Sequence, residues 1–216
     1  MDQEKIDLIR KLFVFGFIKT DFKNPFTFNS RWRSPIYSNI RGCRTKPVVM
    51  NLILDLLKNV FISNESEIVM GVYNGAAAFS ERLAQILDVP SGYVVSKEKR
   101  GSHGLDDLIV GNVKGKRVML IEDVISTATS ILNDKKIIRD AGADEIFCVS
   151  ILDYCLPGAM LHPSMSTGYL TLLTIHDLMP ELKKQLSLKE IVLLKSWIAD
   201  PEHWYDKHKD ELVELV

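Results

Sequence analysis

The sequence predicts an α/β fold in which a central, mostly parallel sheet is flanked by helices. Short apolar runs long enough for buried strands recur through the chain, at 68–70, 93–95, 118–121, 147–152 and 170–173. Helix-length amphipathic segments separate most of the first four runs, and strands that alternate with helices pair in parallel through right-handed crossovers. In such sheets ligands bind beyond the carboxyl ends of the strands. Residues that directly follow these runs are therefore the candidates for a functional site.

Two helices and an irregular segment precede the first of these runs. Apolar residues recur at helical spacing from 6 to 13, behind Asp2 and before Gly16, and again from 49 to 60. Both patterns predict helices with one face toward the core. From 20 to 47 prolines and glycine interrupt short β-prone pieces, which predicts a small subdomain, or hood.

The chain is expected to form one domain over 1–216. Its parts are a hood at about 17–47, a core at about 48–175, and a helical tail at about 176–216. Neither an internal repeat nor an inter-domain linker interrupts the pattern. The tail reads as two or three helices in which Trp197 and Trp204 act as packing anchors.

Charge and cysteine content restrict the class of protein. The chain of 216 residues has 27 basic and 28 acidic side chains, giving a formal net charge of −1. This balance argues against a nucleic acid or an anionic membrane as a partner. Cys43, Cys148 and Cys155 are widely spaced and form no CxxC motif, which argues against a disulfide framework or a zinc site. We expect a cytoplasmic protein, since no signal-like or membrane-spanning apolar run is found.

The segment 117–130 carries the strongest functional pattern. An apolar strand leads into Glu122 and Asp123, and carboxylates in this position need a cation or hydroxyl groups as partners. Small hydroxylated residues follow and precede a predicted helix at 131–141. Free backbone N–H groups, hydroxyls and the helix dipole then converge on one point, which suits a phosphate. The alternative is that the acidic pair favours a helix start and that Ser126 and Thr127 cap it.

This strand, acidic pair, hydroxyl loop and helix closely resemble the 5-phosphoribosyl-1-pyrophosphate signature of type I phosphoribosyltransferases. The resemblance implies the type I phosphoribosyltransferase fold, with Glu122 and Asp123 on the ribose hydroxyls of the donor. It also implies Mg²⁺ near this pair, without a confident assignment of direct protein ligands. The residues implied around the 5-phosphate are Val124, Ile125, Ser126, Thr127, Ala128, Thr129 and Ser130.

Three further stretches resemble orotate phosphoribosyltransferases within that class. They are the hood segment 26–42, the turn 71–75 after the first strand of the core, and the basic stretch 97–104 that ends in His-Gly. The resemblance implies that the basic stretch is a mobile loop with catalytic Lys99, Arg100 and His103. The donor residues that it adds are Tyr73, Asn74 and Lys97, and the orotate-binding residues are Asn29, Ile36, Tyr37, Ser126 and Tyr154.

Several positions depart from the family pattern. Asn29 and Asn74 stand where the family has lysines, and Tyr154 stands where it has an arginine for the orotate carboxylate. Ala128 replaces a glycine, and would be strained if its φ is positive. If orotate is the substrate, another hood cation must hold its carboxylate. Arg31, Arg33, Arg41 and Arg44 all lie in or beside the hood, and Arg31 or Arg33 is the expected residue.

The resemblance implies a Mg²⁺-dependent pentosyltransferase that joins orotate to the donor in de novo pyrimidine biosynthesis. The products are orotidine 5′-monophosphate, a precursor of UMP, and pyrophosphate. The enzyme is expected to be a homodimer in which each loop serves the neighbouring site. Two alternatives remain open at this stage: a phosphoribosyltransferase for another base, and a non-catalytic regulatory protein that binds a nucleotide or the donor.

Overall fold

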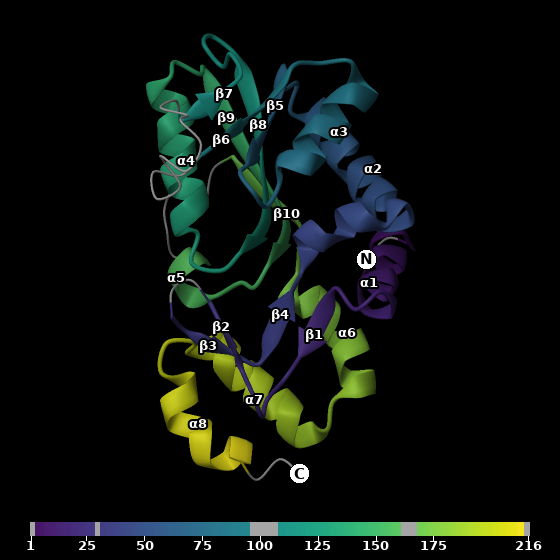
Figure 1. The fold of residues 1–216 in the computed structure, drawn as a ribbon, viewed down its shortest axis with the longest axis vertical. Coiled ribbons are helices and arrows are strands. Elements are labelled where there is room, and N and C mark those ends of the chain that lie inside the picture. The colour runs from purple at the N-terminus through teal and green to yellow at the C-terminus, as the bar shows by residue number, and fades with distance from the viewer. Residues whose placement is uncertain (1–2, 29–30, 96–107, 161–167, 214–216) are drawn as a thin grey trace.

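A computed structural model gives the structure of the protein and describes residues 3–28, 31–95, 108–160 and 168–213. At its centre is a six-stranded sheet in the order β10-β9-β8-β5-β6-β7 (Figure 1). All neighbours pair in parallel except β6 and β7, which are antiparallel. The strands are β5 (Ile68–Val72), β6 (Ser91–Val94), β7 (Ile109–Val110), β8 (Arg117–Ile125), β9 (Glu145–Asp153) and β10 (Tyr169–Thr174). The five predicted strands are confirmed, and the two-residue β7 is an addition.

Helices cover both faces of this sheet, as alternating side chains require in a parallel sheet. Val69, Met119 and Ile121 belong to the core shared with α1, α2 and α3, whereas Met70 and Leu120 pack with α4 residues. The helices are α1 (Gln3–Val14), α2 (Pro47–Ser63), α3 (Ala77–Leu87), α4 (Thr129–Asp140) and α5 (Pro157–Met160). The two helices predicted before the first core strand are confirmed as α1 and α2.

The hood consists of two small antiparallel sheets and a 3-10 helix. β1 (Ile18–Thr20) pairs with β4 (Ile36–Ser38), β2 (Phe26–Thr27) pairs with β3 (Arg33–Ser34), and η1 (Ile40–Thr45) follows. In Figure 1 these strands lie below the carboxyl ends of the central strands. The hood therefore faces the edge of the sheet where a ligand is expected.

Three helices form the C-terminal tail: α6 (Ile175–Gln185), α7 (Leu188–Ala199) and α8 (Trp204–Val213). Trp197 and Trp204 are both fully buried, which confirms their role as packing anchors. The Trp197 indole donates a hydrogen bond to the backbone carbonyl of Arg33 at 3.0 Å. The tail thus supports the hood from the side away from the central sheet (Figure 1).

The strand that carries the acidic pair is longer than the sequence pattern predicts. β8 continues through Glu122 and Asp123 to Ile125, where it still pairs with β9. The predicted strand end at 121 is therefore wrong. The helix start predicted within 117–130 is confirmed, although α4 begins at Thr129, two residues before the expected range 131–141. The extended β9 offers ladder partners up to Asp153, and this pairing overrides the weak strand propensity of two acidic residues.

No helix of the described ranges is long and apolar enough to cross a membrane. The three cysteines are free, as the sequence predicts. Burial raises the pKa of Cys43 to about 12 and that of Cys148 to about 11, so both thiols stay protonated at neutral pH.

Candidate active site

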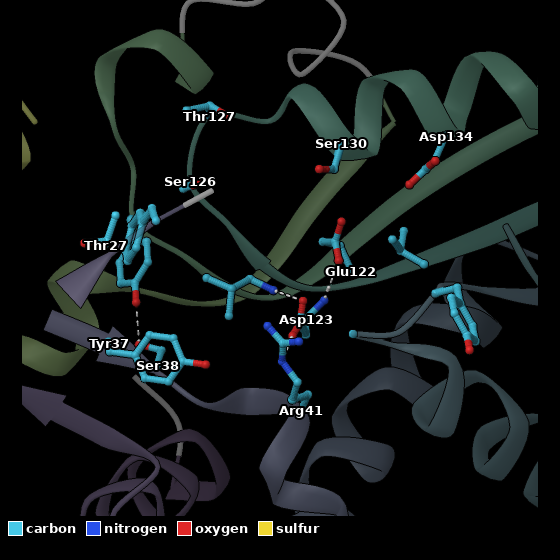
Figure 2. A pocket seen from close by; sticks show the side chains of 16 residues that line it. Thr27, Tyr37, Ser38, Arg41, Glu122, Asp123, Ser126, Thr127, Ser130 and Asp134 are labelled. Carbon is cyan, nitrogen blue, oxygen red and sulfur yellow. Dashed lines mark hydrogen bonds and ion pairs between the residues drawn. The ribbon is translucent and has the colours of Figure 1, made fainter. Parts of the chain in front are cut away.

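An open cavity of about 430 Å³ lies between the carboxyl ends of the central strands and the hood (Figure 2). This volume is within the range of small-molecule sites. Four segments meet there: the hood with η1, the turn after β5, the β8–α4 connection, and the residue after β9. The lining residues are Thr27, Phe28, Tyr37, Ser38, Arg41, Val72, Tyr73, Gly75, Glu122, Asp123, Val124, Ser126, Thr127, Ser130, Asp134 and Tyr154.

The acidic pair lies at the middle of the cavity and its two carboxylates point in different directions. Figure 2 shows Glu122 directed toward Ser130 and Asp134 of α4, and Asp123 directed toward Arg41 of η1. The Asp123 Oδ2 atom lies 3.8 Å from the Arg41 Nε atom. This divergence follows from the strand geometry, since adjacent side chains of β8 alternate between faces.

Glu122 is almost completely buried, with 6% of its surface exposed. Burial, and then the neighbouring carboxylates of Asp123 and Asp134, raise the pKa of Glu122 well above its usual range. The Asp123 backbone N–H donates to Glu122 Oε1 at 3.2 Å, which offsets this effect only in part. A negative charge on Glu122 is therefore costly until a cation or hydroxyl donors reach the cavity.

The turn after β5 approaches the acidic pair closely. Val72, Tyr73 and Gly75 line the cavity, and a Cβ atom on Gly75 would collide with the Asp123 carboxylate. Any side chain at position 75 would have to displace the Asp123 carboxylate, so the backbone of this turn lies directly against the acidic pair. The turn and the acidic pair therefore form one continuous wall.

Ser126, Thr127 and Ser130 supply hydroxyls at the start of α4, whose first backbone N–H groups have no partners within the helix. Ala128 is the N-cap residue and has φ 61° and ψ −1°, in the left-handed region. Ala128 therefore has the positive φ that a glycine would adopt without strain, which explains why the family has a glycine at this position. The loop has the composition and position of an anion site at a helix N-terminus.

Ala128 leads to a prediction about stability. The left-handed conformation costs an alanine about 1–2 kcal/mol, and Ala128→Gly removes that strain. The variant also loses a buried methyl worth about 0.8 kcal/mol and gains unfolded-chain entropy. We expect the free energy of unfolding to change by less than about 1 kcal/mol, as measured by urea denaturation.

Ala128→Val is the matched test, because a β-branched residue is disfavoured at positive φ. We expect a loss of at least about 2 kcal/mol. Equal stability of the two variants would contradict the observed backbone conformation.

Aromatic side chains form the hood end of the cavity. The rings of Phe28 and Tyr154 stack with centroids 5.8 Å apart and planes 20° apart, and Tyr37 lies on the same side. The Tyr154 hydroxyl donates to Ser38 Oγ at 2.9 Å, joining the end of β9 to the hood. Burial raises the pKa of Tyr154, so this hydroxyl stays neutral. A flat, uncharged wall of this kind suits a planar ring.

Tyr154→Phe is expected to remove the link to the hood and keep the stacked ring. The lost hydrogen bond predicts a destabilisation of about 0.5–1.5 kcal/mol, measured by thermal or urea unfolding. Tyr154→Arg should be worse, since it buries a cation between Phe28 and Trp197. An arginine variant as stable as wild type would show that this position is open to solvent.

Nine of the predicted site residues line the cavity. They are Tyr37, Tyr73, Glu122, Asp123, Val124, Ser126, Thr127, Ser130 and Tyr154. Asn29, Lys97, Lys99, Arg100 and His103 lie outside the described residues.

The remaining predicted residues do not line the cavity. Ile36 and Ile125 are buried in the two hydrophobic cores, so their side chains do not face the cavity and any contact with a ligand would come from their backbone. Asn74 is exposed, while Ala128 and Thr129 border the loop. Ile125 is buried because β8 extends as far as this residue, which directs its side chain into the core and away from the cavity.

The sequence pattern did not assign Asp134 to the site, and it offered Arg41 only as one of four hood arginines. Asp134 follows Ser130 by four residues and so lies on the same face of α4, a spacing that could have indicated it. The sequence alone does not separate Arg41 from the other hood arginines, because its position depends on how η1 packs against β8. The hood and the sheet must both be folded before Arg41 meets Asp123.

The comparisons with known proteins agree with this geometry. Residues 44–154 match the family model of the phosphoribosyl transferase domain. The orotate phosphoribosyltransferase of Porphyromonas gingivalis is 32% identical over 200 residues, covering 90% of this chain and 94% of the relative.

Two solved structures are similar in fold. The orotate phosphoribosyltransferase of Aeropyrum pernix is 26% identical with a TM-score of 0.70, covering 83% of this chain and 99% of that one. The Mycobacterium tuberculosis enzyme in complex with 5-phospho-α-D-ribosyl 1-diphosphate is 20% identical with a TM-score of 0.62, over 82% and 99% of the two chains. Family model, sequence relatives and fold agree, and this chain belongs to the orotate phosphoribosyltransferase family of pentosyltransferases, with the type I phosphoribosyltransferase fold.

Proposed function

We propose that the cavity binds 5-phosphoribosyl 1-pyrophosphate and orotate and converts them to orotidine 5′-monophosphate and pyrophosphate. The single observation that carries this proposal is that three kinds of chemistry line one cavity. A hydroxyl-rich helix start, an acidic pair and a group of aromatic rings line the same cavity (Figure 2). These suit a phosphate, a sugar diol and a planar base, which are the three parts of the product.

The phosphate end is assigned to the β8–α4 connection. Ser126, Thr127 and Ser130 offer hydroxyls, and the start of the 12-residue α4 offers N–H groups and the positive end of its dipole. Ala128, Thr129 and the end of β8 contribute through the backbone. The Mycobacterium tuberculosis enzyme of similar fold was solved with this donor, which agrees with the donor as the proposed ligand.

The ribose hydroxyls are assigned to Glu122 and Asp123. Carboxylates accept hydrogen bonds from a diol, and binding would satisfy the buried Glu122, whose charge is costly in the free cavity. The turn with Tyr73 and Asn74 is assigned to the pyrophosphate, because Gly75 brings it against Asp123.

The residues of the cavity fit Mg²⁺ bound together with the donor. Among the described residues no three His, Cys, Asp or Glu side chains form a metal cage. Mg²⁺ commonly binds through one or two carboxylates plus substrate phosphates, and Glu122 and Asp123 are placed for that arrangement. When bound, the ion would stabilise negative charge on the departing pyrophosphate.

The chain's own residues would orient the reactants rather than activate them. The nucleophile is a ring nitrogen of an anionic base, so no strongly basic side chain is required. The aromatic wall would hold the base over C1 of the ribose while the phosphate loop fixes the other end, which is catalysis by orientation. Positive charge that develops on the ribose would be stabilised by the nearby Glu122 and Asp123.

The segment with Lys97, Lys99, Arg100 and His103 is proposed to close over the pyrophosphate. Arg100→Ala should lower kcat by at least about tenfold, or 1.4 kcal/mol of barrier, and weaken donor binding much less. A group that reaches the substrate only in the closed state acts mainly in the transition state. Lys99→Ala is the paired variant, and normal turnover in both would exclude a catalytic loop.

A homodimer with shared sites is also part of the proposal, from the family resemblance. Light scattering on the purified protein gives the mass in solution. Mixing two inactive variants, one altered in the loop and one at Asp123, should restore part of the activity if each loop serves the other subunit. A monomer with full activity would contradict this part of the proposal.

The function itself is tested by measuring pyrophosphate release from the donor with a panel of bases. We expect Mg²⁺-dependent release with orotate, at a kcat/KM well above that for uracil. Preference for a base without a carboxylate would make the protein a phosphoribosyltransferase of other specificity. Donor binding without release for any base would favour the regulatory alternative.

A further inference from the structure

Arg41 is the only lysine or arginine that lines the cavity within the described part of the chain. It is the second residue of η1, three positions after Ser38, and its side chain is 52% exposed. Figure 2 shows it below the acidic pair and beside the hood, with its guanidinium directed at Asp123. Arg41 therefore lies at the boundary between the places proposed for the ribose and for the base.

The other hood arginines do not reach the cavity. The Arg33 guanidinium lies over the Tyr205 ring of α8, 4.8 Å from its centroid. Arg31 and Arg44 are exposed and do not line the cavity. The expectation that Arg31 or Arg33 holds the carboxylate of the base is therefore not supported.

The contact of Arg41 with Asp123 is weak enough to be exchanged. At 3.8 Å the two atoms are beyond hydrogen-bond distance, and the side chain of Arg41 is half exposed. Ion pairs of this kind contribute about 0–1 kcal/mol. Because the proposed role of Asp123 is to bind the ribose diol, arrival of the sugar would leave the guanidinium available for another anion.

The hood end of the cavity needs a cation if its ligand carries a carboxylate. Tyr154 offers none, since its hydroxyl is neutral and donates to Ser38. Phe28, Tyr37 and Thr27 are uncharged as well. The planar guanidinium of arginine binds a carboxylate through two parallel hydrogen bonds, a geometry that lysine cannot reproduce.

We propose that Arg41 binds the carboxylate of the acceptor base and so determines the preference of the site for a carboxylated pyrimidine. The inference rests on the proposed function and deepens it. In the free protein Arg41 pairs with Asp123, and in the complex it pairs with the base. Arg41 is thus a specificity-determining residue, and the same exchange links sugar binding to base binding.

The sharpest test compares two nucleotides that differ only by this carboxylate. Isothermal titration gives the Kd values of orotidine 5′-monophosphate and of UMP for wild type and Arg41→Ala. Any indirect effect through Asp123 weakens both nucleotides alike and cancels in the ratio of the two Kd values. We expect wild type to prefer orotidine 5′-monophosphate, and Arg41→Ala to lose about tenfold or more of that preference.

Arg44→Ala is the matched control, because Arg44 is an exposed arginine of the same 3-10 helix that does not line the cavity. It should keep the wild-type ratio. Arg41→Lys keeps the charge but loses the planar guanidinium with its two parallel hydrogen bonds. Its ratio of the two Kd values should lie between those of wild type and Arg41→Ala. Melting temperatures of all three variants should equal that of wild type, since both side chains are largely exposed.

Two results would overturn the inference. An unchanged ratio of the two Kd values in Arg41→Ala would show that another group binds the carboxylate. An unchanged ratio together with weaker binding of the donor would assign Arg41 to the pyrophosphate. Failure of the proposed function is separate, since wild type would then show no transfer to orotate and no preference between the two nucleotides.

Discussion

Asp123→Asn is expected to weaken binding of 5-phosphoribosyl 1-pyrophosphate by at least about tenfold, and about hundredfold if both ribose hydroxyls bind this carboxylate. The basis is that a charge-assisted hydrogen bond contributes about 1.5–3 kcal/mol. Asp123 lines the middle of the cavity, and its Oδ1 atom already accepts the Val124 N–H at 3.0 Å. Asparagine can keep that local bond through its own oxygen, so the loop should hold its shape while the charge is lost.

Isothermal titration of the donor in the presence of Mg²⁺ measures this effect. Asp140→Asn is the matched control, because Asp140 is an exposed aspartate at the far end of α4 whose carboxylate contacts Lys136. The control should bind the donor as wild type does. Unchanged donor affinity in Asp123→Asn would show that Asp123 does not bind the ribose hydroxyls. The proposed placement of the ribose beside the phosphate loop would then be wrong.

The fold and the centre of the site could be predicted from local patterns. The apolar runs of β5, β8 and β9 and the order of hydroxyls before α4 are properties of contiguous residues. The tryptophans of the tail were predicted as anchors for the same reason, since large apolar side chains seldom stay exposed. These features need no information about which distant segments meet.

The errors arose where distant segments determine the outcome. β8 extends through Glu122 and Asp123 only because β9 pairs with it as far as Asp153. This pairing directs the side chain of Ile125 into the hydrophobic core. Arg41 became a cavity residue only because η1 packs against β8. Tyr154 could be predicted as a site residue, but its bond to Ser38 crosses 116 positions of sequence. The error at β8 reflects strand pairing that overrides local propensity, whereas the positions of Arg41 and Tyr154 depend on contacts between segments distant in sequence.

Glu122→Gln is expected to stabilise the free protein and to weaken donor binding in the same variant. Glu122 is buried beside Asp123 and Asp134, and burial with these neighbours raises its carboxyl pKa well above the usual value of 4.5. Glutamine fills the same space without a charge. The expected gain in the free energy of unfolding is on the order of 1 kcal/mol at pH 8, as is common when a destabilising functional group is removed.

The raised pKa of Glu122 determines how the stability difference between wild type and Glu122→Gln changes with pH. Between pH 4.5 and the raised pKa, the folded protein holds the Glu122 proton more tightly than the unfolded chain does. Stability of wild type therefore falls as pH rises through this window, by proton linkage. The glutamine variant lacks this loss, so its advantage should be near zero at pH 4 and should grow toward pH 8.

Thermal unfolding of wild type and Glu122→Gln from pH 4 to pH 8 measures the difference, and a gain of 1 kcal/mol corresponds to about 2–4 °C for a chain of this size. Glu145→Gln, at the exposed start of β9, is the control and should follow wild type at every pH. Donor titration on the same samples should show weaker binding only in Glu122→Gln. A constant gap across the pH range would mean that Glu122 is charged in the free protein, and its burial would then require a cation that stays in the cavity without the donor.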